Sequence, residues 1–201
     1  MTSMKVLIVT GGIGSGKSSV GEICERRYGA VRLDADRIVH QLLEPGTDVY
    51  ETVVGHFGGT VVAGDGTIKR GALARVVFDD EGELRYLEGL THPKVRDIVR
   101  ARLREAAQAG GELAVVEIPL LGKSGLEGDA DAIVFVAASE ATRLRRLVDK
   151  GASEDEARRR MAAGPDLAAL KDRADYVIDN DGDLGLLEPQ VARVVGSMGL
   201  S

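Results

Sequence analysis

The chain has 201 residues, with 32 acidic and 26 basic side chains and a formal net charge of −6. This length favours one compact body with inserted subdomains over two independent domains, and the acidic balance gives no general reason to expect nucleic-acid binding. Because Cys24 is the single cysteine, an internal disulfide is excluded. Its place in a helix-like segment indicates a buried structural thiol.

The chain opens with a short apolar run at 6–9, followed at once by glycines. This run is too short for a signal-peptide core or a membrane span, so we expect a cytoplasmic protein with no membrane partner. Further apolar runs without polar alternation lie at 114–116, 133–136 and 176–178. Such runs are typical of strands covered on both faces. With the helical patterns between them, they predict an α/β fold in which helices flank a parallel sheet.

The segment after the first apolar run, 11–18, fits the pattern G-x-x-x-x-G-K-[ST] and precedes a predicted helix at 18–27. Glycines let the backbone turn its N–H groups inward, and the helix N terminus adds positive potential, so the loop is suited to phosphate. We expect Lys17 to reach the β and γ phosphates of ATP and the Ser18 hydroxyl to ligate magnesium. The predicted ATP-binding loop comprises Gly12, Ile13, Gly14, Ser15, Gly16, Lys17, Ser18 and Ser19.

Two aspartates, Asp34 and Asp36, follow the second predicted strand at 30–33. Open α/β sheets bind ligands at the carboxyl ends of their strands. Because residues separated by one point to opposite sides of an extended chain, we expect Asp36 to face the acceptor hydroxyl and Asp34 to support it. For each of them, capping the helix that begins near Ala35 is the alternative role.

Two insertions interrupt the predicted sheet. The stretch from about 36 to 111 shows several helix-like segments and no convincing strand, whereas 139–173 is dense in charge. Within the second insertion, Ser153 and Glu156 form the pattern of a capping box at a helix start.

These motifs together resemble the dephospho-coenzyme A kinase family over nearly the whole chain. They occur in the family's order, at 10–18, 33–36, 44–46, 57–58, 65–66, Arg70, 91–93, 118–121 and 174–180. The resemblance implies a P-loop core like that of nucleoside monophosphate kinases, at 1–36, 112–138 and 174–201. It also implies a helical substrate-binding insertion at 37–111 and a helical lid at 139–173. The implied reaction transfers the γ-phosphoryl group of ATP to the ribose 3′-hydroxyl of dephospho-coenzyme A.

The resemblance also implies roles for particular residues, with ATP and Mg²⁺ as cofactors and a small nucleotide as substrate. Lys17, Asp36 and Arg146 are the implied catalytic residues, and Arg143 joins the ATP-binding set. The implied substrate-binding residues are Thr10, Asp34, Arg70, His92, Pro119 and Leu120. From the residues alone, His92 is more typical of a structural histidine, because Pro93 suits the first turn of a helix. We expect a monomer or a small homo-oligomer.

The chain departs from the family pattern mainly in and near the lid. Gly122 and Lys123 stand where the family has an apolar residue and Glu, and Lys150 stands where it has Arg. Arg143 and Gly164 replace Gln, while 167–171 replaces an Arg-bearing segment. Lys lacks the bidentate fork of Arg. Two alternatives therefore stay open, a related kinase acting on another nucleoside or nucleotide, and a catalytically weak nucleotide-binding regulator.

Helical spacing separates the arginines of the lid. It places Arg143 on nearly the same face as Arg146 and Arg145 well round from it. Arg145 is therefore expected to face solvent.

Overall fold

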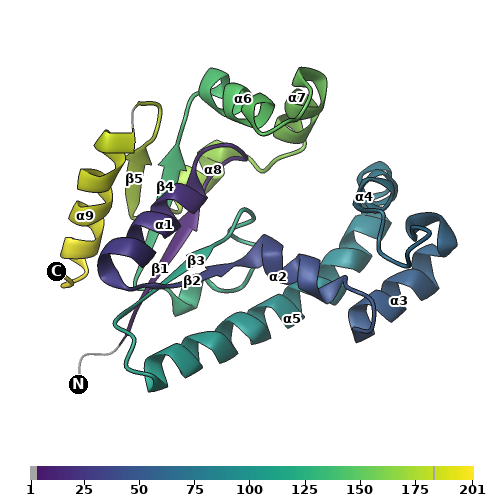
Figure 1. Ribbon diagram of the computed structural model, residues 1–201, viewed down its shortest axis with the longest axis horizontal. Coiled ribbons are helices and arrows are strands. Elements are labelled where there is room, and N and C mark those ends of the chain that lie inside the picture. The colour runs from purple at the N-terminus through teal and green to yellow at the C-terminus, as the bar shows by residue number, and fades with distance from the viewer. Residues whose placement is uncertain (1–3, 183) are drawn as a thin grey trace. The chain divides into compact units, whose positions relative to one another are not determined.

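The computed structural model describes residues 4–182 and 184–201, which contain a sheet of five strands. The strands are β1 (Lys5–Thr10), β2 (Val31–Asp34), β3 (Leu113–Glu117), β4 (Ala132–Ala137) and β5 (Tyr176–Asp179). Their order across the sheet is β2-β3-β1-β4-β5, and every neighbouring pair is parallel (Figure 1). The α/β fold with a parallel sheet, predicted from the unbroken apolar runs, is confirmed.

The register aligns the carboxyl ends of the strands along one edge of the sheet. In the pairing of β2 with β3, Asp34 lies opposite Glu117, and in that of β1 with β4, Thr10 lies opposite Phe135. The chain segments that follow β1, β2 and β3 therefore leave the sheet from this edge.

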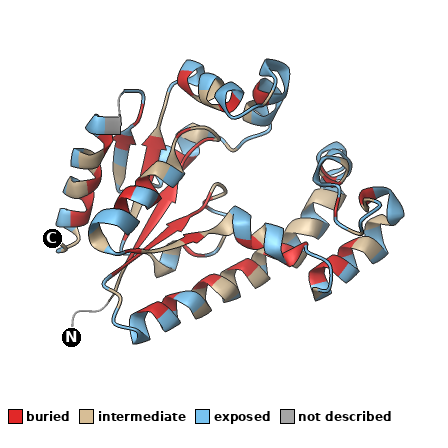
Figure 2. Cartoon of the chain, in the orientation of Figure 1, coloured by how far each residue is buried: buried red, intermediate tan, exposed pale blue. Residues whose placement is uncertain are grey.

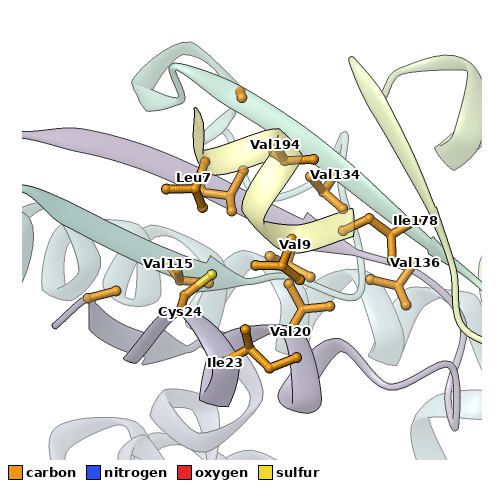
Figure 3. Packing of buried hydrophobic residues seen from close by; sticks show 14 of the residues in the cluster. Leu7, Val9, Val20, Ile23, Cys24, Val115, Val134, Val136, Ile178 and Val194 are labelled. Atoms are coloured by element: carbon orange, nitrogen blue, oxygen red, sulfur yellow. The ribbon is translucent and has the colours of Figure 1, made fainter. Parts of the chain in front are cut away.

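Aliphatic side chains form the core between the sheet and helices α1 (Lys17–Tyr28) and α9 (Leu187–Ser197) (Figure 3). Figure 2 shows the three inner strands, β1, β3 and β4, largely buried. Cys24 lies in this core with none of its surface exposed, and burial raises the pKa of its thiol to about 12. The prediction of a buried structural thiol is confirmed, because a thiol with this pKa stays protonated near neutral pH.

Three further helices follow β4, namely α6 (Glu140–Asp149), α7 (Glu154–Ala162) and α8 (Leu167–Asp172). Each begins at a side-chain cap, since Ser139, Ser153 and Asp166 accept hydrogen bonds from backbone N–H groups of the first turn. The cap predicted at Ser153 is confirmed, with the Glu156 N–H donating to its hydroxyl at 3.2 Å. Short 3-10 turns lie at Glu127–Asp129 and Leu184–Leu186.

The chain divides into two compact units, with boundaries after Asp34 and after Arg100. The sheet unit comprises the described residues up to Asp34 and from Ala101 onward, and the helical unit comprises 35–100. The helical unit contains α2 (Ala35–Leu42), α3 (Asp48–Phe57), the 3-10 turn Gly59–Val61, α4 (Arg70–Asp79) and most of α5 (Glu81–Gln108). Apart from an isolated bridge between Val62 and Ile68, its regular structure is helical, as the sequence predicted.

Two local predictions are wrong. Pro93 lies inside α5 and not in a first turn, because the helix starts twelve residues earlier, where the Asp80 carboxylate accepts from the Gly82 N–H at 2.7 Å. Asp34 and Asp36 do not share an extended segment either. Asp34 ends β2 and α2 begins at Ala35, so Asp36 lies in the first turn of a helix, and the alternation of a strand does not apply to the pair.

Candidate active site

The loop between β1 and α1 is shaped by glycines that could not be replaced without movement. Gly14 and Gly16 have φ angles of +78° and +99°, in the left-handed region that favours glycine. A Cβ at Gly14 would lie 2.8 Å from the backbone oxygen of Arg143, and one at Gly16 would lie 2.1 Å from the side-chain nitrogen of Asn180. The loop is thus packed against residues from α6 and from the end of β5.

Two side chains hold the carbonyl groups of this loop. The Arg146 guanidinium donates from NH1 to Ser15 O at 3.1 Å and from NH2 to Asn180 O at 2.8 Å. Asn180 itself donates from Nδ2 to Ser15 O at 2.7 Å. These bonds fix the loop in the conformation that leads into the N terminus of α1, the end of a helix that attracts phosphate. The predicted contact of Arg146 with a transferring phosphoryl group stays a prediction.

Lys17 folds back across the loop. Its ammonium group donates to Gly11 O at 2.9 Å and to Gly12 O at 3.3 Å. It is therefore held directly over the turn, and its predicted reach to the β and γ phosphates stays a prediction.

A buried carboxylate that the sequence analysis missed lies beneath the start of α1. Glu117 ends β3 and is only 3% exposed. The Ser18 hydroxyl donates to its Oε2 at 3.0 Å, and Arg32 Nε donates to its Oε1 at 2.6 Å. The signal was available, since Glu117 is the one acidic residue of the otherwise apolar run Leu113–Glu117, at the strand end where ligands bind.

A pocket of about 470 Å³ lies beside the loop in the sheet unit. Its lining includes Gly12, Phe135, Arg143, Leu167, Lys171 and Asp179. The guanidinium of Arg143 lies over Gly12, where an added Cβ would be 2.6 Å from NH1. Within the described residues, the buried Nε of Arg143 has no hydrogen-bond partner.

Asp181 also lines this pocket. It accepts from the Ser139 N–H at 2.7 Å. This hydrogen bond, with further ones to Ser139 and Thr142 and the charge of Arg146, lowers the pKa of its carboxyl. The start of α6 is thereby tied to the segment that follows β5.

The remaining predicted residues fall into two groups. Thr10 ends β1 fully buried, while Pro119 and Leu120 follow β3 half-buried, so all three belong to the sheet unit. Asp36, Arg70 and His92 belong to the helical unit, where Asp36 and Arg70 are exposed and His92 is half-buried. The roles assigned to these residues stay predictions.

Gly122, one of the positions that depart from the family pattern, has a local partner. Gly122 has a φ of +94°, and its N–H donates to the Glu127 carboxylate. Arg173 lies 3.9 Å from the same carboxylate. An acidic group is thus present beside Gly122, although it comes from five residues further along the chain.

The exposure of the arginines of α6 differs in the way that helical spacing predicted. Arg143 and Arg146 are half-buried, whereas Arg145 is exposed.

Among residues 4–182 and 184–201 no group of three or more His, Cys, Asp or Glu side chains could hold a metal ion. No helix in the same ranges combines the length and apolar character that crossing a bilayer requires.

The parallel sheet, the phosphate loop after its central strand and the arginine-bearing helix against that loop define a P-loop kinase. The sequence model of dephospho-CoA kinase matches residues 5–185, and the chain belongs to this family. The dephospho-CoA kinase of Symbiobacterium thermophilum is 40% identical over 94% of this chain and 79% of its own length. That of Halalkalibacterium halodurans is 38% identical over 93% of both chains.

Solved structures share this fold. A crystal structure from Thermus thermophilus has a TM-score of 0.83 and 32% identity, covering 99% of this chain and all of its own. Dephospho-CoA kinase from Campylobacter jejuni has a TM-score of 0.68 at 24% identity, covering 96% of both chains. Shikimate kinase from Acinetobacter baumannii, with a TM-score of 0.57 and 15% identity over 100% of this chain and 97% of its own, shares the fold.

Proposed function

We propose that this protein transfers the γ-phosphoryl group of ATP to the ribose 3′-hydroxyl of dephospho-coenzyme A, giving coenzyme A. The observation that carries the proposal is the family match over residues 5–185 together with an intact phosphate loop. The relatives that share 36–40% of its sequence are named dephospho-CoA kinase.

The loop and the adjoining pocket are proposed to bind ATP. The fixed loop presents the N terminus of α1 to the phosphates. The pocket of about 470 Å³ falls within the usual size of a small-molecule site and is proposed to take the adenosine. The Arg143 guanidinium over Gly12 then lies between the loop and this pocket.

Magnesium is proposed to bind through Ser18, with Glu117 beside it. The donor set fits this ion, because Mg²⁺ prefers oxygen ligands and usually combines one or two protein groups with water and substrate phosphates. Bound there, Mg²⁺ would neutralise charge on the phosphates of ATP. Ser18 supplies a hydroxyl oxygen toward this position, while its proton is donated to Glu117.

Cationic side chains are proposed to stabilise the transfer. Catalysis of phosphoryl transfer depends mainly on positioning and on charges set in advance. Lys17 is held over the loop by two carbonyl groups, and we propose that its ammonium exchanges them for phosphate oxygens when ATP binds. Arg146 keeps the loop in place through Ser15 O and is proposed to meet the transferring group on lid closure.

The residues proposed to bind the acceptor are those that the family resemblance implies. Asp36 is proposed as the base that takes the proton of the 3′-hydroxyl, with Asp34 supporting it. The other acceptor-side residues in this proposal are Thr10, Arg70, His92, Pro119 and Leu120. That the protein works in the cytoplasm, as a monomer or small homo-oligomer, also stays a prediction.

One observation favours a second candidate function. The family's acidic position is occupied here by Lys123, and the segment 167–171 lacks the usual Arg, so a related kinase with another nucleoside or nucleotide acceptor is the competing proposal. The test is incubation with Mg-ATP and a panel of nucleosides, nucleotides and dephospho-coenzyme A, with each product identified by mass. Preferred phosphorylation of another acceptor would replace the first proposal, and no transfer to any acceptor would favour a regulator.

A further inference from the structure

The buried carboxylate of Glu117 has both of its oxygens engaged. Oε1 accepts from Arg32 Nε at 2.6 Å, and Oε2 accepts from the Ser18 hydroxyl at 3.0 Å. Arg32 stands on β2, where it lies opposite Val115, two residues before Glu117 on the neighbouring strand. The three side chains therefore form a chain of hydrogen bonds from the edge strand to the start of α1.

Helix α1 has no side chain at the position that lies over this ion pair. Gly21 lies one turn after Ser18, and a Cβ there would be 2.7 Å from Glu117 Oε1 and 2.8 Å from Arg32 Nε. Both distances are shorter than real Cβ contacts allow. Glycine is a poor helix former, so its presence inside α1 has a specific local use: it leaves room for the Arg32–Glu117 ion pair.

The ion pair offsets the free-energy cost of burying the Glu117 carboxylate. A carboxylate removed from water needs a close opposite charge and hydrogen bonds to both oxygens. Arg32 is 23% exposed and Glu117 4% exposed at the side-chain level. Burial lowers the pKa of Arg32, but the hydrogen bond and charge of Glu117, with Glu22 and Glu25, outweigh it and raise the pKa overall. Arg32 thus stays charged, and its planar guanidinium donates from Nε to Glu117 and from a second nitrogen to Glu22 at 3.5 Å.

The direction of the Ser18 hydroxyl follows from this arrangement. A serine hydroxyl has one proton and two lone pairs. When the proton is donated to Glu117 Oε2, the lone pairs are left for a cation on the other side of the oxygen. A Glu117 side chain that could rotate would let the hydroxyl rotate with it.

We propose that Arg32 is a positioning residue for the metal–nucleotide site, which acts by holding Glu117 so that Ser18 presents its oxygen to magnesium bound with ATP. The inference rests on the proposed function only in taking Mg-ATP as the bound nucleotide. It does not depend on the acceptor. The competing explanation is that the ion pair only joins β2 to β3 and stabilises the fold.

The experiment compares Arg32→Met with the wild-type protein in calorimetric titrations of ATP, once with excess Mg²⁺ and once with a chelator. Partners of a metal ligand typically contribute about 10- to 100-fold to metal affinity. We therefore expect Mg-ATP affinity to fall about tenfold, while the affinity for metal-free ATP stays within about twofold. In transfer assays, the half-saturating Mg²⁺ concentration should rise by about the same factor. Arg32→Lys keeps the charge and loses the planar guanidinium. Its Mg-ATP affinity should therefore lie between those of the wild-type protein and Arg32→Met.

A matched control removes another strand ion pair. Lys5 is 2.8 Å from Asp131 and starts β1, whereas the phosphate loop follows the other end of that strand. Lys5→Met should lower thermal stability and leave the ratio of the two ATP affinities unchanged.

Gly21→Ala tests the same series of hydrogen bonds without removing a charge. Its methyl group should push the ion pair apart and reduce Mg-ATP affinity in the same selective way. The double variant with Arg32→Met should lose less Mg-ATP affinity than the sum of the two single losses, because both act on the same ion pair. It also decides the question if Arg32→Met does not fold. The proposal is overturned if either variant lowers the unfolding temperature but leaves the affinity ratio at the wild-type value. Failure of the wild-type protein to phosphorylate dephospho-coenzyme A would overturn the proposed function instead, since the binding ratio is measured without an acceptor.

Discussion

The side-chain nitrogen of Asn180 donates to the backbone oxygen of Ser15 at 2.7 Å, across 165 positions of sequence. Asn180 follows β5, and Ser15 lies in the loop that follows β1, so the bond joins two strand ends separated in the sheet by β4. Only 3% of Asn180 is exposed. The phosphate loop therefore depends on the far end of the chain for its conformation.

Replacing Asn180 should weaken nucleotide binding through the loop. Asn180→Ala leaves Ser15 O with one donor fewer, and loss of a buried hydrogen bond costs about 1–3 kcal/mol. Asn180→Asp keeps the shape but sets an acceptor against the carbonyl, so its loss of ATP affinity should be larger. Calorimetric titration measures both. Ser197→Ala, which removes bonds to the Tyr176 hydroxyl and to Val194 O, is the control and should leave ATP affinity near the wild-type value.

Replacing each of two neighbouring arginines of α6 should affect kcat very differently. Arg146→Ala removes three hydrogen bonds to the carbonyls of the loop and of Asn180, and it removes the proposed contact with the transferring phosphoryl group. We expect a strong reduction of kcat. Arg145 is exposed, and a solvated surface charge contributes little, so Arg145→Ala should be nearly neutral in the same assay. Equal losses would show that α6 acts only as a diffuse positive patch.

Lys17→Ala should abolish transfer while weakening nucleotide binding less. The ammonium group is expected to offset charge that develops on the β and γ phosphates, and losing it should cost several kcal/mol of transition-state stabilisation. Steady-state kinetics and ATP titration, performed on the same preparation, separate the two effects. A variant that keeps more than roughly a tenth of wild-type turnover would contradict the role of Lys17.

Asp36→Asn tests the proposed base. Asn keeps the shape and hydrogen bonding of Asp but does not accept the proton of the acceptor hydroxyl. General-base catalysis typically contributes about 100-fold or more, so kcat should fall by about that factor, with ATP affinity near normal. A collapse of Mg-ATP affinity with kcat preserved would instead place Asp36 with the metal.

The sequence predicted those parts of the fold that local pattern determines. Unbroken apolar runs indicated buried parallel strands, and the pattern of residues 11–18 located the loop at the end of the first strand. The start of α5 was misjudged because Pro93 gave a stronger local signal than the capping aspartate Asp80. Helix α2 begins immediately after Asp34, so the chain is not extended through Asp36, as the expected alternation of Asp34 and Asp36 required.

The sequence patterns could not predict contacts between the ends of distant strands. Arg32 meets Glu117 because β2 and β3 are neighbours, and Asn180 meets Ser15 because both strands end at the same edge. Sheet order decides such pairs, and neither helical nor strand periodicity encodes it. Glu117 still carried a usable signal as an acidic residue ending an apolar strand, and Arg32 had none at the level of local pattern.

The central claim is that this chain phosphorylates the ribose 3′-hydroxyl of dephospho-coenzyme A. The most direct measurement combines the purified protein, Mg-ATP and dephospho-coenzyme A, with the product identified by mass and by phosphorus NMR, which locates the new phosphate. We predict one added phosphoryl group on the 3′ oxygen, with a higher kcat/KM than for any other nucleoside or nucleotide tested. A product phosphorylated elsewhere, or a clearly higher kcat/KM for another acceptor, would contradict the account.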